Sequence, residues 1–337
     1  MNMKWLLRRI KWLPRDVAVL LIALKIRTLP ERRRAKLTFA FDAVRAEDGT
    51  GAQIQRLIAT KALSLILGCN YQHAPIEKIA IHPLDPFQDT PSMKKFVAKL
   101  NNEFIFHESL KQDYLYILEF PDLKVSQLWK LYIQTKMDSP TLVRVLNPYL
   151  LVDLLPSFYR KALAKRVIHN QSSSQEHKES IAVHYRQGVG GFVIYPGMKT
   201  PRQIPFDVYL TRLRKIVRSE PQKFSVKLFT DAPKKPTTFK PPKEQEHLWI
   251  GTPGFDNSTM TIKNFDPYKS LRSEVSSLEI HEGGDPLQAI MEISRADYIL
   301  MSRSSLSYVA ALLAPKSTVV FYPKNFWHPK LRGWKRL

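Results

Sequence analysis

The sequence predicts an α/β protein built from two lobes, and three observations lead to this prediction. The chain has 337 residues, which suits two domains of ordinary size better than one. In its C-terminal half, short apolar segments alternate with amphipathic ones, as in a largely parallel sheet covered by helices on both faces. Residues 170–180 (NQSSSQEHKES) lack large apolar side chains and are the predicted linker between the lobes.

Composition restricts the classes of protein to consider. Apolar residues make up 44% of the chain, enough to bury real cores. The net charge of +22 implies an anionic partner: nucleic acid, acidic lipid or a phosphorylated substrate. The single cysteine, Cys69, excludes an intrachain disulfide framework and a cysteine-rich zinc site, and favours a reducing compartment. The sequence has no Asp-x-Asp pair, so no metal and no other cofactor is expected.

Residues 1–37 form a basic N-terminal segment with eleven Lys or Arg residues and two acidic ones. The apolar run 17–24 is only eight residues long, far below the ~20 that span a bilayer, and no signal-peptide cleavage site follows it. Tryptophan and leucine alternate with cations before this run. Two interpretations stay open: an interfacial helix on an anionic membrane, or an ordinary packed helix with a basic face. We therefore expect a cytoplasmic protein, peripheral at the inner face of a membrane if the first holds.

The N-terminal lobe is expected over residues 38–169. It begins with a strand near 37–41, then a glycine turn, a helix over 53–67 with Gly68 as its C-cap, and a strand over 69–74. This order is one βαβ-like unit. Residues 91–168 are predicted to be mostly helical, with breaks at Pro121, Pro140, Pro148 and Pro156. The glycine turn (Gly49, Gly51 and Gln53) lacks the spacing of a dinucleotide fingerprint and is expected to face an interdomain cleft.

The C-terminal lobe is expected over residues 181–325, followed by a basic tail over 326–337. The predicted strands are 181–185, 226–229, 278–281, 298–301 and 318–321, and the predicted helices are 206–217, 287–294 and 304–314.

Polar clusters follow four of these strands, where ligands of open parallel sheets bind. They are His184-Tyr185-Arg186, Thr230-Asp231, Gly283-Gly284-Asp285 and Ser302-Arg303-Ser304-Ser305. The serine run opens a helix, so its backbone N–H groups and hydroxyls suit a phosphate; the alternative is that one serine is only an N-cap. Arg186 precedes three glycines and offers a bidentate fork for a diphosphate; the alternative is a surface arginine. We expect His184 to be a packed, hydrogen-bonding histidine.

The order DGTGAQIQR, HYRQG, LFTDA and DPLQAI…ADYILMSRSSLSYVAALL resembles the GDP-fucose-dependent fucosyltransferases of GT-B architecture, including the α-1,2-, α-1,6- and protein O-fucosyltransferases. The resemblance covers roughly 40–75 and 181–322. It implies two Rossmann-type lobes with a cleft between them. It also implies that Arg186 binds the donor diphosphate, that Ser304 and Ser305 touch phosphate, and that Asp285 binds guanine.

The resemblance thus predicts an inverting, metal-independent glycosyltransferase. It would move a sugar, with fucose as one candidate, from a nucleotide donor, preferably a GDP-sugar, to a glycan or glycolipid hydroxyl. The predicted donor site contains His184, Arg186, Asp231, Asp285, Ser304 and Ser305, with Arg186 as the catalytic group. Where many members carry an acidic residue after His-x-Arg, this chain has Gln187 and glycines, so no base is assigned. Two alternatives stay open: a non-catalytic polyanion or nucleic-acid binder, although no nucleic-acid-binding motif is found, and another α/β enzyme acting on phosphorylated compounds.

Overall fold

The chain divides into two compact α/β units. The computed structural model describes residues 3–46, 48–80, 90–106, 113–137, 139–163, 179–186, 203–218, 220–231, 237–240, 255–256, 259–262, 271–275 and 277–337. The first unit comprises Met1–Asp48, Ala52–Ile79 and Met93–Val167, and the second comprises Gly49–Gly51, Ala80–Ser92 and Ile168–Leu337. Each contains a parallel sheet, so the predicted α/β class is confirmed.

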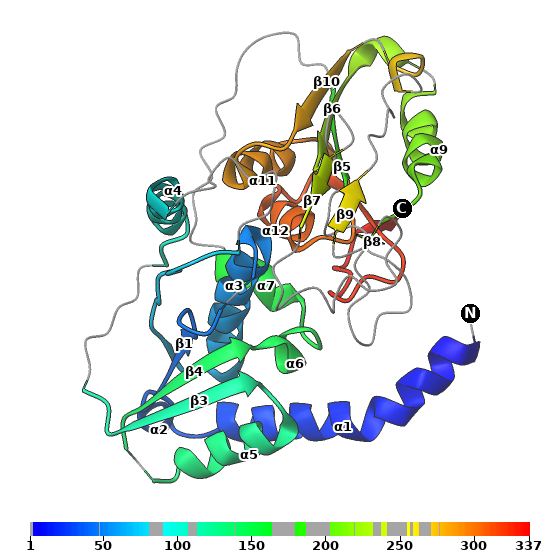
Figure 1. Cartoon of the computed structure of the whole chain (residues 1–337). Coiled ribbons are helices and arrows are strands. Elements are labelled where there is room, and N and C mark those ends of the chain that lie inside the picture. The colour runs from blue at the N-terminus through cyan, green and yellow to red at the C-terminus, as the bar shows by residue number, and fades with distance from the viewer. Residues whose placement is uncertain are drawn as a thin grey trace. The chain divides into compact units, whose positions relative to one another are not determined.

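The first unit is built on a four-stranded sheet in the order β2-β1-β4-β3, with all neighbours parallel (Figure 1). Its strands are β1 (Leu37–Phe41), β2 (Asn70–Tyr71), β3 (Tyr116–Asp122) and β4 (Thr141–Asn147). Its helices are α1 (Met3–Arg27), α2 (Glu31–Arg34), α3 (Thr50–Leu67), α4 (Thr90–Glu103), α5 (Val125–Gln134), α6 (Tyr149–Val152) and α7 (Ser157–Leu163), although the first residues of α3 and α4 group with the second unit. The predicted strand–helix–strand unit is present as β1, α3 and β2. Gly68 ends α3 with φ +68°, a conformation that favours glycine.

The prediction that residues 91–168 are mostly helical is wrong, because β3 and β4 lie within this range. β4 lies between β1 and β3, and its central residues are buried. A strand covered on both faces is as continuously apolar as a buried helix, so periodicity does not separate the two. Pro121, expected to break a helix, lies inside β3 instead. β3 is an edge strand, where a missing N–H is tolerated.

The second unit is built on a six-stranded sheet in the order β10-β6-β5-β11-β12-β13. Its strands are β5 (Glu179–Tyr185), β6 (Phe224–Thr230), β10 (Leu278–Glu282), β11 (Tyr298–Leu300), β12 (Val319–Tyr322) and β13 (Lys335–Arg336). All neighbours are parallel. Numbered along the chain, the order is 3-2-1-4-5-6, the doubly wound arrangement of nucleotide-binding sheets. A small antiparallel sheet of β7 (Thr237–Phe239), β9 (Thr259–Ile262) and β8 (Phe255–Asp256) is separate from it.

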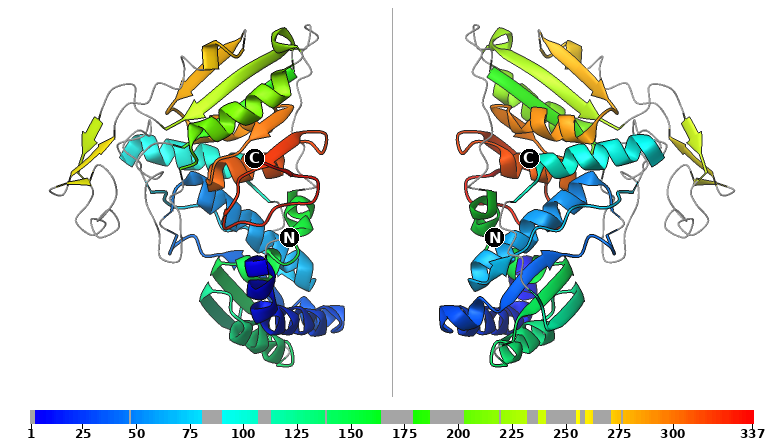
Figure 2. Two further views of the ribbon diagram at one scale, coloured as in Figure 1. Left: turned by 90° about the vertical axis from the view of Figure 1, so that its right-hand side faces the viewer. Right: turned by 90° about the vertical axis from the view of Figure 1, so that its left-hand side faces the viewer.

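Helices cover both faces of this sheet (Figures 1 and 2). α9 (Phe206–Val217) lies on one side, and α11 (Pro286–Ser294) and α12 (Ser305–Leu313) lie together on the other. The buried residues of α9 are Phe206, Tyr209, Leu210, Leu213 and Val217, the spacing of one helical face. They pack against alternate residues of β5, whose intervening residues point to the opposite face.

Two segments that the sequence places outside the lobes, the linker and the basic tail, contain residues of this sheet's strands. β5 begins at Glu179, so the last two residues of the predicted linker 170–180 are strand, while 164–178 lie outside the described residues. The predicted basic tail 326–337 contains β13, and Leu331 and Trp334 within it are buried. These residues therefore belong to the second unit's core and sheet edge. In the described part of the chain, no helix combines the length and the apolar character needed to cross a bilayer.

Candidate functional site

The carboxyl ends of four adjacent strands gather the predicted polar clusters at one edge of the second unit's sheet. β10, β6, β5 and β11 are consecutive neighbours and all run parallel. The chain moves outward from β5 to β6 and β10, then returns to the other side of β5 with β11. The strand order therefore reverses between β5 and β11, and such a switch point is where doubly wound sheets bind their ligands. Arg186 follows β5 and Ser302 follows β11, so both lie at this point.

Arg186 joins the clusters of three strands. Its Nη1 donates to Ser304 Oγ at 3.1 Å, and its Nε lies 3.8 Å from Asp231 Oδ2. Its side chain is only 15% exposed, so the alternative of a surface arginine does not hold. Nε is buried and, among the residues that the structure describes, has no hydrogen-bond partner. A buried, incompletely bonded guanidinium is a strong donor for an anion, because low exposure limits screening.

Ser304 is the N-cap of α12. Its Oγ accepts from the backbone N–H of Leu306 at 3.3 Å while also accepting from Arg186. The hydroxyl has two acceptor positions and one donor, so its O–H remains to donate to a further group. The capping alternative from the sequence is therefore correct for Ser304, and it coexists with the contact to the arginine.

Ser305 makes a contact that the sequence reasoning missed. Its Oγ lies 3.2 Å from Nε2 of His328, which also accepts from Nε1 of Trp327 at 2.7 Å. His328 is buried, and Tyr308 and Phe326 pack around its ring. Because the indole N–H can only donate, Nε2 is the acceptor of that bond, and Ser305 Oγ lies within reach of the same nitrogen. His328 lies beyond the last predicted helix, and no spacing in the sequence relates it to Ser305.

His184 lies within the sheet layer, as expected for a hydrogen-bonding histidine. Its Nδ1 is 2.8 Å from Ser302 Oγ, and Ser302 Oγ lies 3.5 Å from Ser307 Oγ. Burial lowers the pKa of His184 to about 4; Asp231 opposes this shift and Arg186 adds to it. His184 is therefore neutral at physiological pH. It supports the start of α12 through Ser302 rather than carrying charge to a ligand.

Asp285 lies at the carboxyl end of β10 and caps α11. Its Oδ1 accepts from the backbone N–H groups of Leu287 at 2.8 Å and Gln288 at 3.2 Å. The preceding glycines have φ +64° and +90°, and the N–H of Gly283 donates to the carbonyl of Thr230 at 2.8 Å. The turn thus brings Asp285 to the same sheet edge as Asp231. Its predicted role toward guanine stays a prediction.

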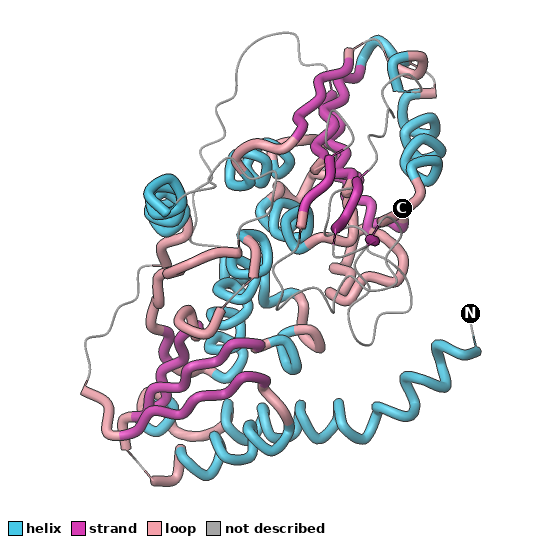
Figure 3. The backbone as a smooth tube through the Cα atoms, in the orientation of Figure 1, coloured by secondary structure: helices cyan, strands magenta, loops and turns pink. Residues whose placement is uncertain are grey.

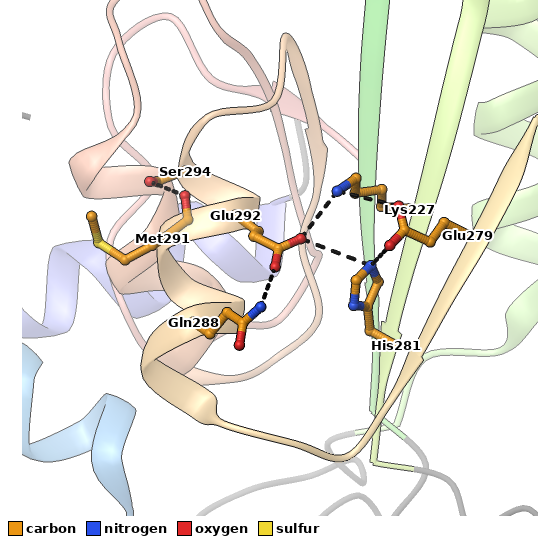
Figure 4. Close-up of polar contacts among 7 residues, drawn as sticks. All are labelled: Lys227, Glu279, His281, Gln288, Met291, Glu292 and Ser294. Atoms are coloured by element: carbon orange, nitrogen blue, oxygen red, sulfur yellow. Dashed lines mark hydrogen bonds and ion pairs between the residues drawn. The ribbon is translucent and has the colours of Figure 1, made fainter. Parts of the chain in front are cut away.

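A polar network fastens α11 to the strands beneath it (Figure 4). Lys227 of β6 lies 3.1 Å from Glu292 of α11 and 3.2 Å from Glu279 of β10. His281 Nε2 is 2.9 Å from Glu279, and Gln288 donates to Glu292 at 2.9 Å. Partial burial acts to raise the pKa of Glu292, but hydrogen bonds from Gln288 and Lys227 give a net lowering. This network positions the helix that Asp285 caps.

The glycine turn is divided between the two units. Gly49 and Gly51 group with the second unit, where a Cβ on Gly51 would lie only 2.4 Å from the backbone N of Leu306. Glycine is therefore required at position 51 by close backbone approach. Gln53 belongs to the first unit and is fully buried; its Nε2 donates to the carbonyls of Asp48 at 2.8 Å and Lys78 at 2.6 Å. Its contacts organise its own loop.

The first unit holds a carboxyl group that the sequence reasoning also missed. Asp153 follows α6, and its Oδ1 accepts from the hydroxyl of Tyr159 at 2.9 Å. Burial raises the pKa of Asp153 to about 7, although this hydrogen bond opposes the shift. Burial likewise raises the pKa of neighbouring Tyr149, which Arg56 partly offsets. A carboxyl group with a pKa near neutrality occurs often at functional sites, so Asp153 is a candidate of the first unit.

Comparison with known proteins does not assign the chain to a family. No protein-family model matches the chain, and no curated protein has a significantly similar sequence.

Proposed function

We propose that the chain is an inverting, metal-independent glycosyltransferase that binds the diphosphate of a nucleotide sugar at the β5–β11 switch point. One observation carries the proposal: Arg186 is held against Ser304, the N-cap of α12, where the sheet order reverses. A buried guanidinium and a helix start are two independent anion-binding elements, and they meet here.

The diphosphate would lie against both elements. Arg186 supplies a full positive charge, and the N-terminus of α12 supplies the equivalent of roughly half a charge from its aligned peptide dipoles. The hydroxyl of Ser304 adds a donor. Asp231 faces the guanidinium at 3.8 Å and holds its orientation.

In the proposed transfer, these groups stabilise the departing diphosphate. The acceptor hydroxyl oxygen forms a bond to the anomeric carbon, and the bond from that carbon to the phosphate oxygen breaks. The electron pair leaves with the diphosphate, whose charge Arg186 and the helix start neutralise. The hydroxyl proton passes to a general base, for which no residue is assigned. Fixed donors aimed at developing charge are usually the largest catalytic contribution in such a site.

The remaining roles in the proposal follow the family resemblance. The architecture would be GT-B, with the second unit holding the donor and the first unit holding a glycan or glycolipid acceptor. Asp285 would read the guanine of a GDP-sugar, and fucose is the candidate sugar. The doubly wound sheet supports the donor role, because its strand order is that of nucleotide-binding domains.

The proposal is tested by thermal unfolding of the full chain with GDP, UDP, ADP and CMP in turn. A nucleotide present at 100 times its dissociation constant stabilises the protein by ~2.7 kcal/mol. We expect stabilisation by GDP or UDP that exceeds that of CMP, which lacks a diphosphate. Heparin and inorganic pyrophosphate serve as controls for general anion binding. Equal stabilisation by heparin and by every nucleotide would favour the polyanion-binding alternative and contradict the proposal.

A further inference from the structure

Helix α1 is apolar on two opposite faces, and only one of them is covered. Residues on the covered face pack into the first unit. They are Val19, Ile22, Ala23 and Ile26, all at most 8% exposed. The opposite face remains in solvent. Its residues are Val17 (45% exposed), Leu20 (39%), Leu21 (54%) and Leu24 (58%). Both sets follow the i, i+3, i+4, i+7 spacing of one helical face, so the exposed residues form a continuous stripe.

Helix α5 extends this stripe. α1 and α5 lie side by side in the first unit (Figure 1). Trp129 and Ile133 of α5 are 44% and 47% exposed. Lys25 of α1 lies over the ring of Trp129, with its Nζ 5.6 Å from the ring centroid, and 5.9 Å from that of Tyr132. Hence the exposed side chains of the two helices make one surface, which we call the α1–α5 face.

The two helices that form this face carry many more basic than acidic residues. α1 carries seven Lys or Arg residues and one acidic residue, Asp16. Residues 124–137, which include α5, carry three lysines and no acidic residue. Lys25, Lys130 and Lys136 are all exposed. The combination is an apolar strip with a tryptophan and a tyrosine near it, bordered by positive charge.

We propose that the α1–α5 face docks on the surface of an anionic phospholipid bilayer. Aliphatic side chains would enter the acyl boundary, Trp129 and Tyr132 would lie at the headgroup level, and the lysines would contact lipid phosphates. A second copy of the chain fits less well. α1 contains Pro14 and changes direction along its length (Figure 3). Proline removes a helical hydrogen bond and kinks the helix, which interrupts a straight helix-to-helix seam.

The test compares two matched variants of the full chain, Leu24→Glu and Val44→Glu. Both positions are 58% exposed and apolar, and both variants change the net charge equally, but Val44 lies outside α1 and α5. Binding is measured by co-sedimentation with vesicles of phosphatidylcholine alone and of phosphatidylcholine mixed with an anionic phospholipid. The native chain should bind the anionic vesicles preferentially, and less as salt rises. Leu24→Glu should weaken binding about tenfold or more, because a leucine leaves the acyl region. Val44→Glu should bind nearly as the native chain does.

Three results would overturn the proposal. One is no binding of the native chain to anionic vesicles. Another is equal weakening by both variants, which would assign binding to charge spread over the chain. A third is a concentration-dependent dimer that Leu24→Glu dissolves without any lipid binding, which would assign the face to a second copy. Nucleotide-dependent stabilisation of the same samples reports on the second unit alone. Failure of lipid docking is therefore distinguishable from failure of the proposed transferase activity.

Discussion

Replacement of Arg186 by lysine tests the central contact of the proposed donor site. The native guanidinium donates to Ser304 through Nη1, while its Nε faces Asp231 at a distance too long for a hydrogen bond. A diphosphate approaching this edge would find a planar fork already oriented by two neighbours. Lysine keeps the positive charge but presents a single ammonium and cannot form two parallel bonds.

The expected loss follows from one charge-assisted hydrogen bond. Such bonds contribute ~1.5–3 kcal/mol, which corresponds to a dissociation constant about 10 to 150 times higher. Take a nucleotide at 100 times its native dissociation constant, where it stabilises the protein by ~2.7 kcal/mol. A thirtyfold weaker variant at the same concentration would retain only ~0.9 kcal/mol by the same relation. With ~2–4 °C of melting temperature per kcal/mol, the nucleotide-induced shift would fall by roughly 4–7 °C.

The assay is differential scanning fluorimetry with and without the best nucleotide, for native chain, Arg186→Lys and a control. Arg214→Lys is the matched control, because Arg214 lies on α9 of the same unit and pairs with Glu274 at 2.7 Å. The control should keep the full nucleotide-induced shift. If Arg186→Lys keeps it too, Arg186 does not touch the nucleotide and the proposed site is wrong.

Three further predictions concern metal dependence and pH. The proposed transferase activity should survive EDTA, because the sequence has no Asp-x-Asp pair; loss of turnover that Mg²⁺ or Mn²⁺ restores would contradict the proposed mechanism. Burial lowers the pKa of His184 to about 4, so the neutral ring's contribution to stability is full above pH about 6.5 and declines toward pH 4 by at most ~1.4 kcal/mol per unit. His184→Gln should reduce this dependence of stability on pH, as measured by calorimetry. An unchanged dependence would mean that another group causes it. The contribution of Asp153 to stability depends on pH in the opposite direction. Burial raises the pKa of Asp153 to about 7, so its contribution is largest at low pH and is lost as pH rises through 7. Asp153→Asn should therefore raise the melting temperature of the first unit above pH 7, and a lower value there would refute this reasoning.

The main helices and strands of the second unit could be predicted because the sequence patterns that specify them lie within each element. α9 was predicted over 206–217 and observed over the same residues, since its apolar spacing and the flanking Pro205 are both in the sequence. The turn after β10 was predictable from Gly283 and Gly284, which adopt positive φ. Polar residues directly after apolar strands indicated which side chains would share one edge of the sheet, because parallel strands bring their carboxyl ends together.

Contacts between distant segments were not predictable in this way. His328 reaches Ser305 only because the chain after β12 folds back over α12. Asp153 gains its raised pKa from burial that only the folded first unit provides. Strand β4 was not predicted from the sequence for a related reason. It lies between β1 and β3, so it lacks the alternation of apolar and polar residues that marks a half-exposed strand. Its Thr141, Val143 and Val145 were the available signal, since β-branched residues favour strands.

Ser304 has two interpretations, a helix cap alone or a helix cap that also binds the diphosphate, and one substitution distinguishes them. Its oxygen already accepts from Leu306 and Arg186, so a structural role is satisfied without any ligand. Aspartate caps a helix about as well as serine and would pair with Arg186, so Ser304→Asp should fold with nearly native stability. It would also place a negative charge where the diphosphate is proposed to lie and remove the hydroxyl donor. We therefore expect Ser304→Asp to abolish nucleotide-induced stabilisation, whereas Ser304→Gly, which costs only a few tenths of a kcal/mol at an N-cap, should retain most of it. Nucleotide binding that persists in Ser304→Asp, measured by titration calorimetry, would mean that the start of α12 is only capped and that the anion binds elsewhere.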